Sequence, residues 1–407
     1  MRETLETFVS FASYPGEEAA VQSWFREHLD ALGFQLYEWE PDAEALAAHP
    51  SFPPVETLAL DDRPSVAGVL ELGDPEAGPT LVLNGHADVV PVEEAAWTSD
   101  PFEPRWADGE LYARGALDMK GGLVACVFAA LAVAERGVDL DGRLVVESVV
   151  GEEEGGIGAA TAAMENPYPF ERDAALIAEP SDFHVVIAAE GSLMKRLGIV
   201  GQSAHAARTW EGESVLPHFE RIRHAFEALE RERAERVTHP LYEGYENPWP
   251  VNFGTVDAGS WASSVPARLT SEIRIGVAPH ETVAGVEAEY RERLDEVVAE
   301  SDWLSAHPPT FERFSVQFEG SEIDRTEPIV ERLVDAAAGH GIAEPVFEGF
   351  TGGTDARHYI EAGIPTVVFG PGSVDLAHRP DEHVRWDDVV AASEIIAATA
   401  ESYLETE

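Results

Sequence analysis

Histidines and carboxylates follow short apolar runs at several distant places in this 407-residue chain. His86 comes directly after LVLNG, and Glu179 comes directly after AALIA. Glu152 and Glu153 follow LVVESVVG, and His378 lies several residues after TVVF. Imidazole nitrogens and carboxylate oxygens, in a chain without a cluster of thiolates, form a site suited to zinc, cobalt or manganese. These residues therefore predict a metal centre.

The apolar runs predict buried strands that carry these side chains to one place. Alternating strands and helices are typical of βαβ units and a mainly parallel sheet, which places ligands at the carboxyl ends of its strands. Asp118 lies in the loop before an apolar helix, where a carboxylate can bridge two cations. Carboxylates gathered at such an edge would repel one another unless cations lay between them. The predicted elements are strands over 80–83, 144–150 and 174–177, and helices over 21–32 and 121–134.

A different order of elements begins near Glu190. It reads β-α-β-β-α-β, the split βαβ arrangement of a small α+β domain. We therefore expect a doubly wound α/β catalytic domain, made of residues 1–189 and 320–407, with an α+β lid or dimerisation domain inserted at residues 190–319. The proline-rich segment 41–64 is predicted to be a loop without an assigned purpose. The predicted elements after residue 190 are strands over 193–200, 251–256, 269–277, 310–318 and 365–369, and helices over 215–236, 282–300 and 327–339.

Seven stretches of the sequence resemble the M20 metallopeptidase family, which includes acetylornithine deacetylase, succinyl-diaminopimelate desuccinylase, aminoacylase-1 and carboxypeptidase G2. Their order along nearly the whole chain makes the resemblance specific, although each alone would be weak. The resemblance implies cleavage of an amide bond at two divalent metal ions. The stretches are GHADVVP from Gly85, ARGALDMKGG from Ala113, GEEEGGIG from Gly151, AEPS from Ala178, GQSAHA from Gly201, GGTDAR from Gly352 and AHRPDEHV from Ala377.

The same resemblance implies how the metal ligands are shared. His86 and Glu179 would hold one ion. His378 and Glu153 would hold the other, and Asp118 would bridge the pair. Zinc is the expected metal, with cobalt or manganese as alternatives.

Three consecutive glutamates leave the register of the third stretch open by one position. In the family the glutamate pair is followed by one variable residue and then by glycine, so Gly155 makes Glu152 the general base and Glu153 the ligand. Glu154 is then expected to lie in a solvated acidic turn. Glu152 would take the proton of a water that bridges two metals about 3.5 to 4 Å apart, and would then protonate the leaving nitrogen.

Two further motif residues have implied roles. Asp88 resembles the carboxylate that holds the imidazole of the histidine ligand in one tautomer, although it could instead cap a turn. His205 lies in the inserted domain, and the resemblance implies a homodimer in which His205 reaches the partner's site and stabilises the oxyanion. The alternative for His205 is an ordinary surface histidine.

Substrate binding is expected to involve two arginines and three smaller residues. Arg357 and Arg274 match family positions that grip a substrate carboxylate, a task suited to the planar guanidinium, although both could form salt bridges on an acidic surface. Asn252 is expected to position the scissile carbonyl. Gly352 and Gly353 would let backbone amides approach the substrate, or would simply form a turn. Histidines without a matching motif are expected to be structural or exposed; these are His184, His218, His280, His340, His358 and His383.

The composition excludes several partners. Acidic residues outnumber basic ones 76 to 27, for a formal charge of −49, so nucleic acid and anionic membrane would be repelled. Lys120 and Lys195 are the only lysines, which favours a halophilic source, where self-repulsion is screened within roughly 3 Å at 1 M salt; an ordinary acidic protein is the alternative. Cys126, the only cysteine, is expected to be buried and inert. No segment is expected to reach the ~18 apolar residues that span a bilayer, and a cytoplasmic location follows by default.

The expected function is therefore removal of an N-acyl group from an amino acid or a related amine. A metallo-dipeptidase or carboxypeptidase of the same family is the alternative, and nothing in the motifs separates the two. A catalytically silent binding protein is a third possibility, against which the intact Glu152 argues. The acyl group, the amino acid, the physiological metal and the pathway are not determined by the sequence.

Overall fold

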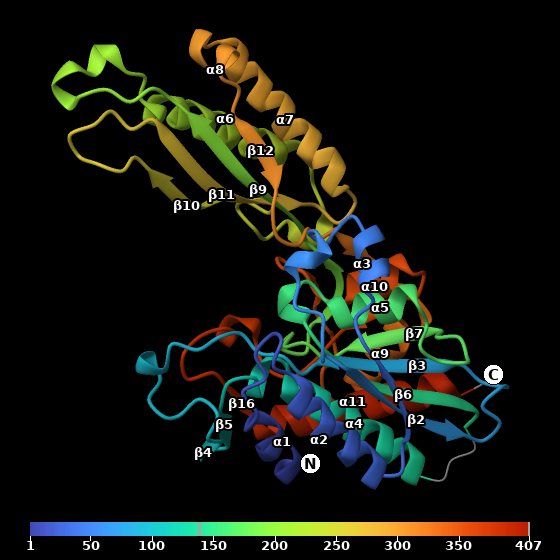
Figure 1. Cartoon of the computed structure of the whole chain (residues 1–407). Coiled ribbons are helices and arrows are strands. Elements are labelled where there is room, and N and C mark those ends of the chain that lie inside the picture. The colour runs from blue at the N-terminus through green and yellow to red at the C-terminus, as the bar shows by residue number, and fades with distance from the viewer. Residues whose placement is uncertain (137–139, 406–407) are drawn as a thin grey trace.

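The structure is a computed structural model that describes residues 1–136 and 140–405. Figure 1 shows a thick α/β body and a smaller, elongated body that projects from it. The larger body contains the main sheet, and the smaller one contains a separate four-stranded sheet. The expected fold class, a mainly parallel α/β domain with an inserted α+β domain, is confirmed.

The main sheet has nine strands in the described part of the chain. Its central strands β6, β3, β7 and β15 run parallel, and antiparallel pairs lie towards its edges. The central strands are buried along their length because helices cover both faces, which explains their continuous apolar sequences. In order across the sheet the strands are β1 (Gln35–Trp39), β2 (Ser65–Leu72), β6 (Gly142–Val149), β3 (Thr80–His86), β7 (Ala174–Ile177), β15 (Thr366–Val368), β8 (Val185–Ala189) and β13 (Ser321–Glu322), with β14 (Phe347–Phe350) also paired to β8.

Helices form a layer on each face of the main sheet (Figure 1). The stretch Ala116–Glu135, which contains α4, is long and apolar enough to cross a membrane, contrary to our expectation for the sequence, but most of it is buried and it forms a core helix. Cys126 on α4 is buried, and burial raises the pKa of its thiol, as expected of an inert residue. One layer holds α1 (Arg2–Val9), α2 (Ala19–Ala31), α4 (Gly121–Glu135), α9 (Pro328–Gly339) and α11 (Trp386–Leu404), and the other holds α3 (Ala43–Ala48), α5 (Ile157–Met164) and α10 (Ala356–Glu361).

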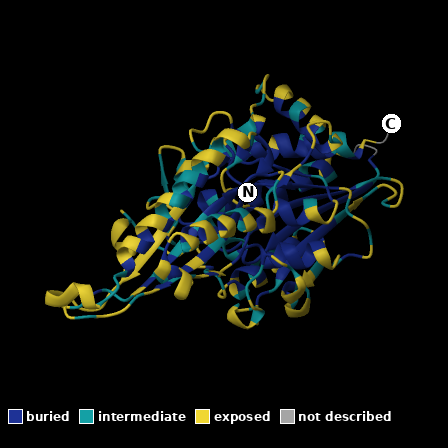
Figure 2. Ribbon diagram, turned by 90° about the horizontal axis from the view of Figure 1, so that it is seen from above, coloured by how far each residue is buried: buried dark blue, intermediate teal, exposed yellow. Residues whose placement is uncertain are grey.

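The inserted body follows the expected β-α-β-β-α-β order. Its antiparallel sheet has the strand order β10-β11-β9-β12 and a separate apolar core under its two long helices. Outside this core, many residues of the inserted body are exposed (Figure 2). The last strand ends at Arg313, earlier than expected, and a short helix precedes it. The elements are β9 (Gly191–Val200), α6 (Val215–Arg236), β10 (Val251–Ala258), β11 (Arg268–Val277), α7 (Val283–Ala299), α8 (Asp302–Ala306) and β12 (Thr310–Arg313).

The chain crosses between the two bodies twice, and the two crossings are hydrogen-bonded to each other. One crossing joins β8 to β9, and the other joins β12 to β13. Ser192 N–H donates to Phe318 O at 2.7 Å, and Phe318 N–H donates to Ser192 O at 2.8 Å. A third, three-stranded sheet of β16 (His383–Arg385), β5 (Glu110–Tyr112) and β4 (Arg105–Ala107) lies beside the main one. The domain limits at 189/190 and 319/320 remain predictions.

The segment 41–64 is not the plain loop that its prolines predicted. It contains helix α3, which the Asp42 carboxylate caps by accepting the backbone N–H of Ala45 at 2.7 Å. The prolines flank the apolar sequence AEALAA rather than interrupting it, so the helix forms between them. At the end of the segment, Arg63 pairs with buried Glu18 and, at 2.8 Å, with Glu154. Glu154 is therefore paired with an arginine rather than simply solvated.

Candidate metal centre

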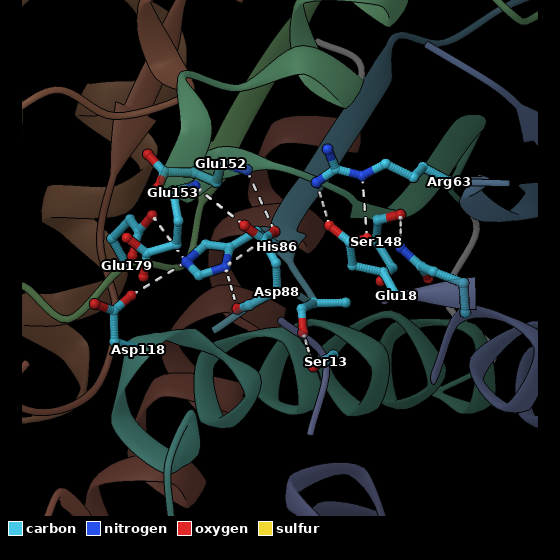
Figure 3. Close-up of polar contacts among 12 residues, drawn as sticks. Ser13, Glu18, Arg63, His86, Asp88, Asp118, Ser148, Glu152, Glu153 and Glu179 are labelled. Carbon is cyan, nitrogen blue, oxygen red and sulfur yellow. Dashed lines mark hydrogen bonds and ion pairs between the residues drawn. The ribbon is translucent and has the colours of Figure 1, made fainter. Parts of the chain in front are cut away.

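The register of three parallel strands brings the predicted ligands together. His86 at the end of β3 lies opposite Val149 of β6, just before the glutamates of the following turn. Asn84 of β3 lies opposite Ile177 of β7, two residues before Glu179. The side chains that follow the three strands therefore meet at one edge, as Figure 3 shows.

His86 lies at the bottom of this cluster, with 1% of its surface exposed. Its Nδ1 lies 2.9 Å from the backbone oxygen of Asp88, which can accept the Nδ1 proton and direct Nε2 into the site. Nε2 lies 3.1 Å from Asp118 Oδ1 and 3.8 Å from Glu179 Oε1 (Figure 3). The imidazole is thus positioned for metal binding through Nε2.

The Asp88 carboxylate lies behind the cluster, 3.6 Å from the His86 ring at its nearest oxygen. Its two oxygens accept the backbone N–H groups of Glu152 and Glu153, at 3.3 and 3.1 Å. The backbone oxygen of Asp88 contacts the imidazole more closely than the expected carboxylate does, and the carboxylate anchors the glutamate turn.

Asp118 lies between the two histidines. Its Oδ1 faces His86, and its Oδ2 lies 3.2 Å from Nε2 of His378. The same His378 nitrogen lies 3.1 Å from Glu153 Oε1, in a loop where half of the His378 side chain is exposed. Because the two oxygens of Asp118 point to different histidines, this carboxylate is placed to bridge two ions.

The electrostatics of the cluster fit divalent cations. Burial raises the pKa of Glu152 and of Glu179, and neighbouring carboxylates raise both further. Hydrogen bonds to Asp118 and Glu153 raise the pKa of His378 to about 10. Burial opposes ionisation of Asp118, but hydrogen bonds from both histidines outweigh it and hold its pKa well below the usual range. The protonated imidazoles of His86 and His378 thus supply the positive charge that bound metal ions would supply to these carboxylates.

Two overlapping groups of side chains could each hold an ion. The first is His86, Glu152 and Glu179, and the second is His86, Asp118 and Glu153. Within each group, one donor atom from each residue lies within 4.8 Å of the others. Both groups contain His86, and their imidazole and carboxylate donors suit a divalent ion such as zinc; the division of the ligands between two ions stays a prediction.

Glycines shape the turn that carries Glu152. Gly155 and Gly156 have φ angles of 104° and 76°, a left-handed conformation that other residues rarely adopt. A Cβ atom on Gly155 would lie 2.4 Å from the Val316 side chain, so the turn also packs too closely for a larger residue.

Arg357 lies behind this turn rather than at the surface of the pocket. Only 4% of it is exposed, and its guanidinium donates to the backbone oxygens of Gly155 at 2.6 Å and Thr354 at 3.0 Å. Its Cζ stacks 4.1 Å from the centre of the Phe318 ring. These contacts hold the glutamate turn, and the expected role of Arg357 in binding a substrate carboxylate stays a prediction.

Two acidic residues near the site were missed by sequence reasoning. Glu382 is buried and accepts the backbone N–H groups of Leu117 at 3.0 Å and Asp118 at 3.1 Å, while its other oxygen pairs with Arg114. Asp355 is buried without a hydrogen-bond partner for either carboxylate oxygen, and burial raises its pKa to about 7. Both lie within motifs quoted above, AHRPDEHV and GGTDAR, which was the available signal.

A pocket of about 390 Å³ opens above the cluster. The predicted Gly352 and Gly353 line it, together with the glutamates of the cluster and His378. Residues that the sequence did not single out complete its walls; these are Pro180, Tyr245, Phe318, Glu348, Phe350, Thr351, Thr354, Val374 and Ala377.

The structure does not bring the predicted residues of the inserted body to the cluster. Arg274 and Asn252 are partners across β11 and β10. Arg274 pairs with Glu190 at 3.1 Å and donates to the Thr351 oxygen, at the edge of the pocket. His205 is exposed and directly precedes the turn Ala206–Glu211, which lies at the end of the inserted body farthest from the main sheet (Figure 1).

A doubly wound sheet that gathers two histidines and several carboxylates at one edge is the framework of a metal-dependent hydrolase. The chain belongs to peptidase family M20/M25/M40, whose model matches residues 82–402. It is thus a metal-dependent hydrolase of C–N bonds.

Curated relatives cover most of the chain. The chain is 27% identical to the N-formyl-4-amino-5-aminomethyl-2-methylpyrimidine deformylase of Bacillus subtilis, over 97% of this chain and 92% of that one. It is 32% identical to the succinyl-diaminopimelate desuccinylase of Gluconacetobacter diazotrophicus, over 80% and 81%.

Solved structures share the fold at lower sequence identity. The M20 family metallo-carboxypeptidase Sso-CP2 from Sulfolobus solfataricus has a TM-score of 0.76 at 16% identity, covering 99% of this chain and 98% of that one. The aminopeptidase PepT from Bacillus cereus has a TM-score of 0.74 at 19% identity, covering 100% and 99%.

Proposed function

We propose that this protein is a deacylase that removes an N-acyl group from an amino acid or a related amine. The observation that carries the proposal is that relatives named for removing succinyl and formyl groups align with most of the chain at about 30% identity. The buried Glu152 beside the candidate metal ligands supports hydrolytic chemistry at this site.

The proposed ligands are divided as the sequence predicted. His86 and Glu179 would hold one ion, and Glu153 and His378 would hold the other. Asp118, whose two oxygens face the two histidines, bridges them. We propose zinc, because imidazole and carboxylate ligands suit it. When bound, the two ions make water more acidic and polarise the amide carbonyl.

In this proposal Glu152 moves the proton. Its carboxylate, directed into the pocket, takes a proton from the attacking water and delivers it to the leaving nitrogen. Asp88 and Arg357 hold the turn that carries Glu152 by binding its backbone at Glu152 and Gly155. Gly352 and Gly353 line the space where the acyl group and the amine would lie.

The proposal includes a homodimer in which His205 acts on the partner's site. The exposure of His205 supports action in trans, as does the place of the turn that follows it, at the end of the inserted body farthest from the main sheet (Figure 1). Arg274, at the pocket edge, is proposed to bind a substrate carboxylate, with Asn252 beside it. The cytoplasm of a halophile remains the proposed setting, because of the charge of −49.

A metallo-dipeptidase or carboxypeptidase of the same family is the second candidate. Its support is the fold that the chain shares with the metallo-carboxypeptidase and the aminopeptidase named above. Their sequence identities to this chain are only 16% and 19%. The deacylase has the stronger support because its relatives are more similar in sequence.

A substrate panel tests the proposal. The zinc-loaded protein in concentrated KCl would be assayed against N-formyl, N-acetyl and N-succinyl amino acids and against dipeptides. Release of free amine from the acyl substrates, with dipeptides cleaved at least tenfold more slowly, is the expected result. A preference for dipeptides would select the second candidate, and binding without any turnover would indicate a silent protein.

A further inference from the structure

Three consecutive glutamates follow β6, and the proposed chemistry uses only the first two. Glu152, Glu153 and Glu154 form one short helical turn, closed by the backbone N–H of Gly155, which donates to Glu152 O at 2.8 Å. The carboxylate of Glu154 accepts a hydrogen bond from Nη1 of Arg63 at 2.8 Å. A contact that fixes Glu154 therefore restrains the backbone that carries the proposed base.

Arg63 is itself held firmly. It is fully buried, and all three of its guanidinium nitrogens have acceptors. Nε and Nη2 donate to the two carboxylate oxygens of Glu18, a fully buried residue at the start of α2 (Figure 3). Nη1 donates to Ala59 O at 2.8 Å as well as to Glu154. Because a bidentate pair fixes the plane of the guanidinium, Arg63 presents Nη1 to the glutamate turn in one orientation.

The same guanidinium also lies against the beginning of the turn. A Cβ atom on Gly151, the residue before Glu152, would lie 3.0 Å from Nη2 of Arg63. Gly151 has a φ angle of 68°, which a larger residue would adopt only with strain. Arg63 thus touches the turn on both sides of Glu152, at Gly151 and at Glu154.

Other contacts hold the turn through its backbone alone. Asp88 accepts the N–H groups of Glu152 and Glu153, and Arg357 donates to Gly155 O. Arg63 adds a bond to a side chain of the turn. It comes from residues before position 82, where the match to the family model begins. The contact is therefore made by a part of the chain that the family model does not cover.

We propose that Arg63 is a positioning residue, which acts through Glu154 to hold Glu152 in the orientation that proton transfer requires. The inference rests on the proposed deacylase function and adds a residue to its machinery. Arg63 does not line the pocket, so its loss should change the rate of the chemical step rather than the binding of substrate.

Glu154→Ala tests the inference without disturbing the buried pair of Arg63 with Glu18. For the zinc-loaded protein in concentrated KCl, with an acyl substrate that the wild type cleaves, kcat should fall about tenfold while KM changes less than twofold. Glu154→Gln keeps an oxygen that accepts from Nη1, so its kcat should stay within about threefold of the wild type.

Glu76→Ala is the matched control. Glu76 is also a glutamate paired with a buried arginine, Arg143, but this pair lies at the start of β6, at the end of the strand away from the turn. Its kcat should equal that of the wild type.

Hydrogen exchange gives a second measurement that needs neither metal nor turnover. In the metal-free protein, the peptide over residues 150–158 should exchange faster in Glu154→Ala than in the wild type, and no faster in Glu76→Ala. Unchanged exchange in Glu154→Ala would contradict the restraint of the turn.

A double-mutant cycle tests whether Arg63 acts through Glu154. Arg63→Met leaves Glu18 buried and unpaired, so it should also lower stability, which denaturant unfolding would measure. If Arg63 acts through Glu154, the double variant should lose no more kcat than Arg63→Met alone. Losses of kcat that multiply in the double variant would show a different route and overturn the inference.

The remaining outcomes separate this inference from the proposed function. A wild-type kcat in Glu154→Ala, or a loss that excess zinc restores, would overturn the positioning of Glu152 and leave the deacylase function intact. No turnover of any acyl substrate by the zinc-loaded wild type would overturn the proposed function, and this inference with it.

Discussion

The two bodies of this molecule use charged residues in opposite ways. In the larger body, Asp118, Glu152 and Glu179 are gathered at the end of a buried sheet, where their pKa values are strongly perturbed. In the inserted body, charges lie between the two long helices, as in the pair of Arg233 with Glu289 at 2.9 Å. One arrangement concentrates like charge for binding cations, and the other pairs opposite charges.

This difference assigns the charged groups of the larger body to catalysis and those of the inserted body to stability. Carboxylates crowded at one edge oppose folding unless cations or imidazolium groups neutralise them, so their arrangement is explained by function. Ion pairs between helices need no ligand to be satisfied. Substitutions in the larger body should therefore affect rate and metal binding, whereas those between α6 and α7 should affect stability.

Glu152→Gln should produce the largest loss of activity. The amide cannot accept the proton of water, so kcat should fall by about a thousandfold or more, while zinc content stays the same. Steady-state kinetics together with atomic absorption would measure both. Retained turnover with full zinc content would remove Glu152 from the mechanism.

His205→Ala should lower kcat by about a hundredfold without changing zinc content, because an oxyanion donor would be lost. Mixed dimers sharpen the test. Subunits carrying His205→Ala, combined with subunits carrying Glu152→Gln, would form one complete site if His205 acts in trans. Recovery of activity on mixing is expected, and its absence would argue for action within one subunit or no role.

Glu382→Ala should weaken zinc binding by about 10- to 100-fold, since Glu382 holds the backbone at Leu117 and Asp118 and thereby orients the bridging carboxylate. Competition with a chelator would measure the affinity. The exposed Glu394→Ala on α11 is the control and should bind zinc like the wild type. If Glu382→Ala and Glu394→Ala bound zinc equally well, Glu382 would not orient the bridging carboxylate and would contribute only to the stability of the fold.

Arg233→Ala should have the smallest effect on catalysis and a measurable effect on stability. Arg233 is fully buried between Glu281 and Glu289, and its loss leaves Glu281 without its ion-pair partner and Glu289 with Arg236 alone. We expect the free energy of unfolding to fall by about 3 kcal/mol, with kcat changed less than twofold. Denaturant unfolding would test this, with the exposed neighbour Arg231→Ala as control. A loss of kcat at unchanged stability would contradict the separation of roles.

Sequence reasoning located the strands well and the loops poorly. Helix α6 and strand β7 have the predicted limits because their apolar periodicity is uninterrupted. Helix α3 was missed because the prolines around it suggested a loop. The short extent of β12 could not be predicted, because apolar content does not indicate where hydrogen bonding to β9 ends.

In the candidate site, too, the sequence predicts some side-chain positions and not others. His86, Glu153 and Glu179 could be predicted to lie together because each follows a strand whose neighbours are set by register, and their role as ligands stays a prediction. The contacts of Arg357 could not be predicted, because they are made to backbone oxygens of Gly155 and Thr354 that no sequence pattern reports. Glu348 was missed because one carboxylate among 76 acidic residues carries no distinguishing signal.

The paired crossings between the two bodies have a mechanical consequence. Two chain segments tied by reciprocal hydrogen bonds at Ser192 and Phe318 form a ribbon, which bends across its face more easily than it twists or shears. The inserted body should therefore swing about one axis rather than move freely. Since Phe318 belongs to this ribbon and also lines the pocket, such a swing would move one wall of the pocket. The orientation of the inserted body would therefore affect access to the metal centre through the side chain of Phe318.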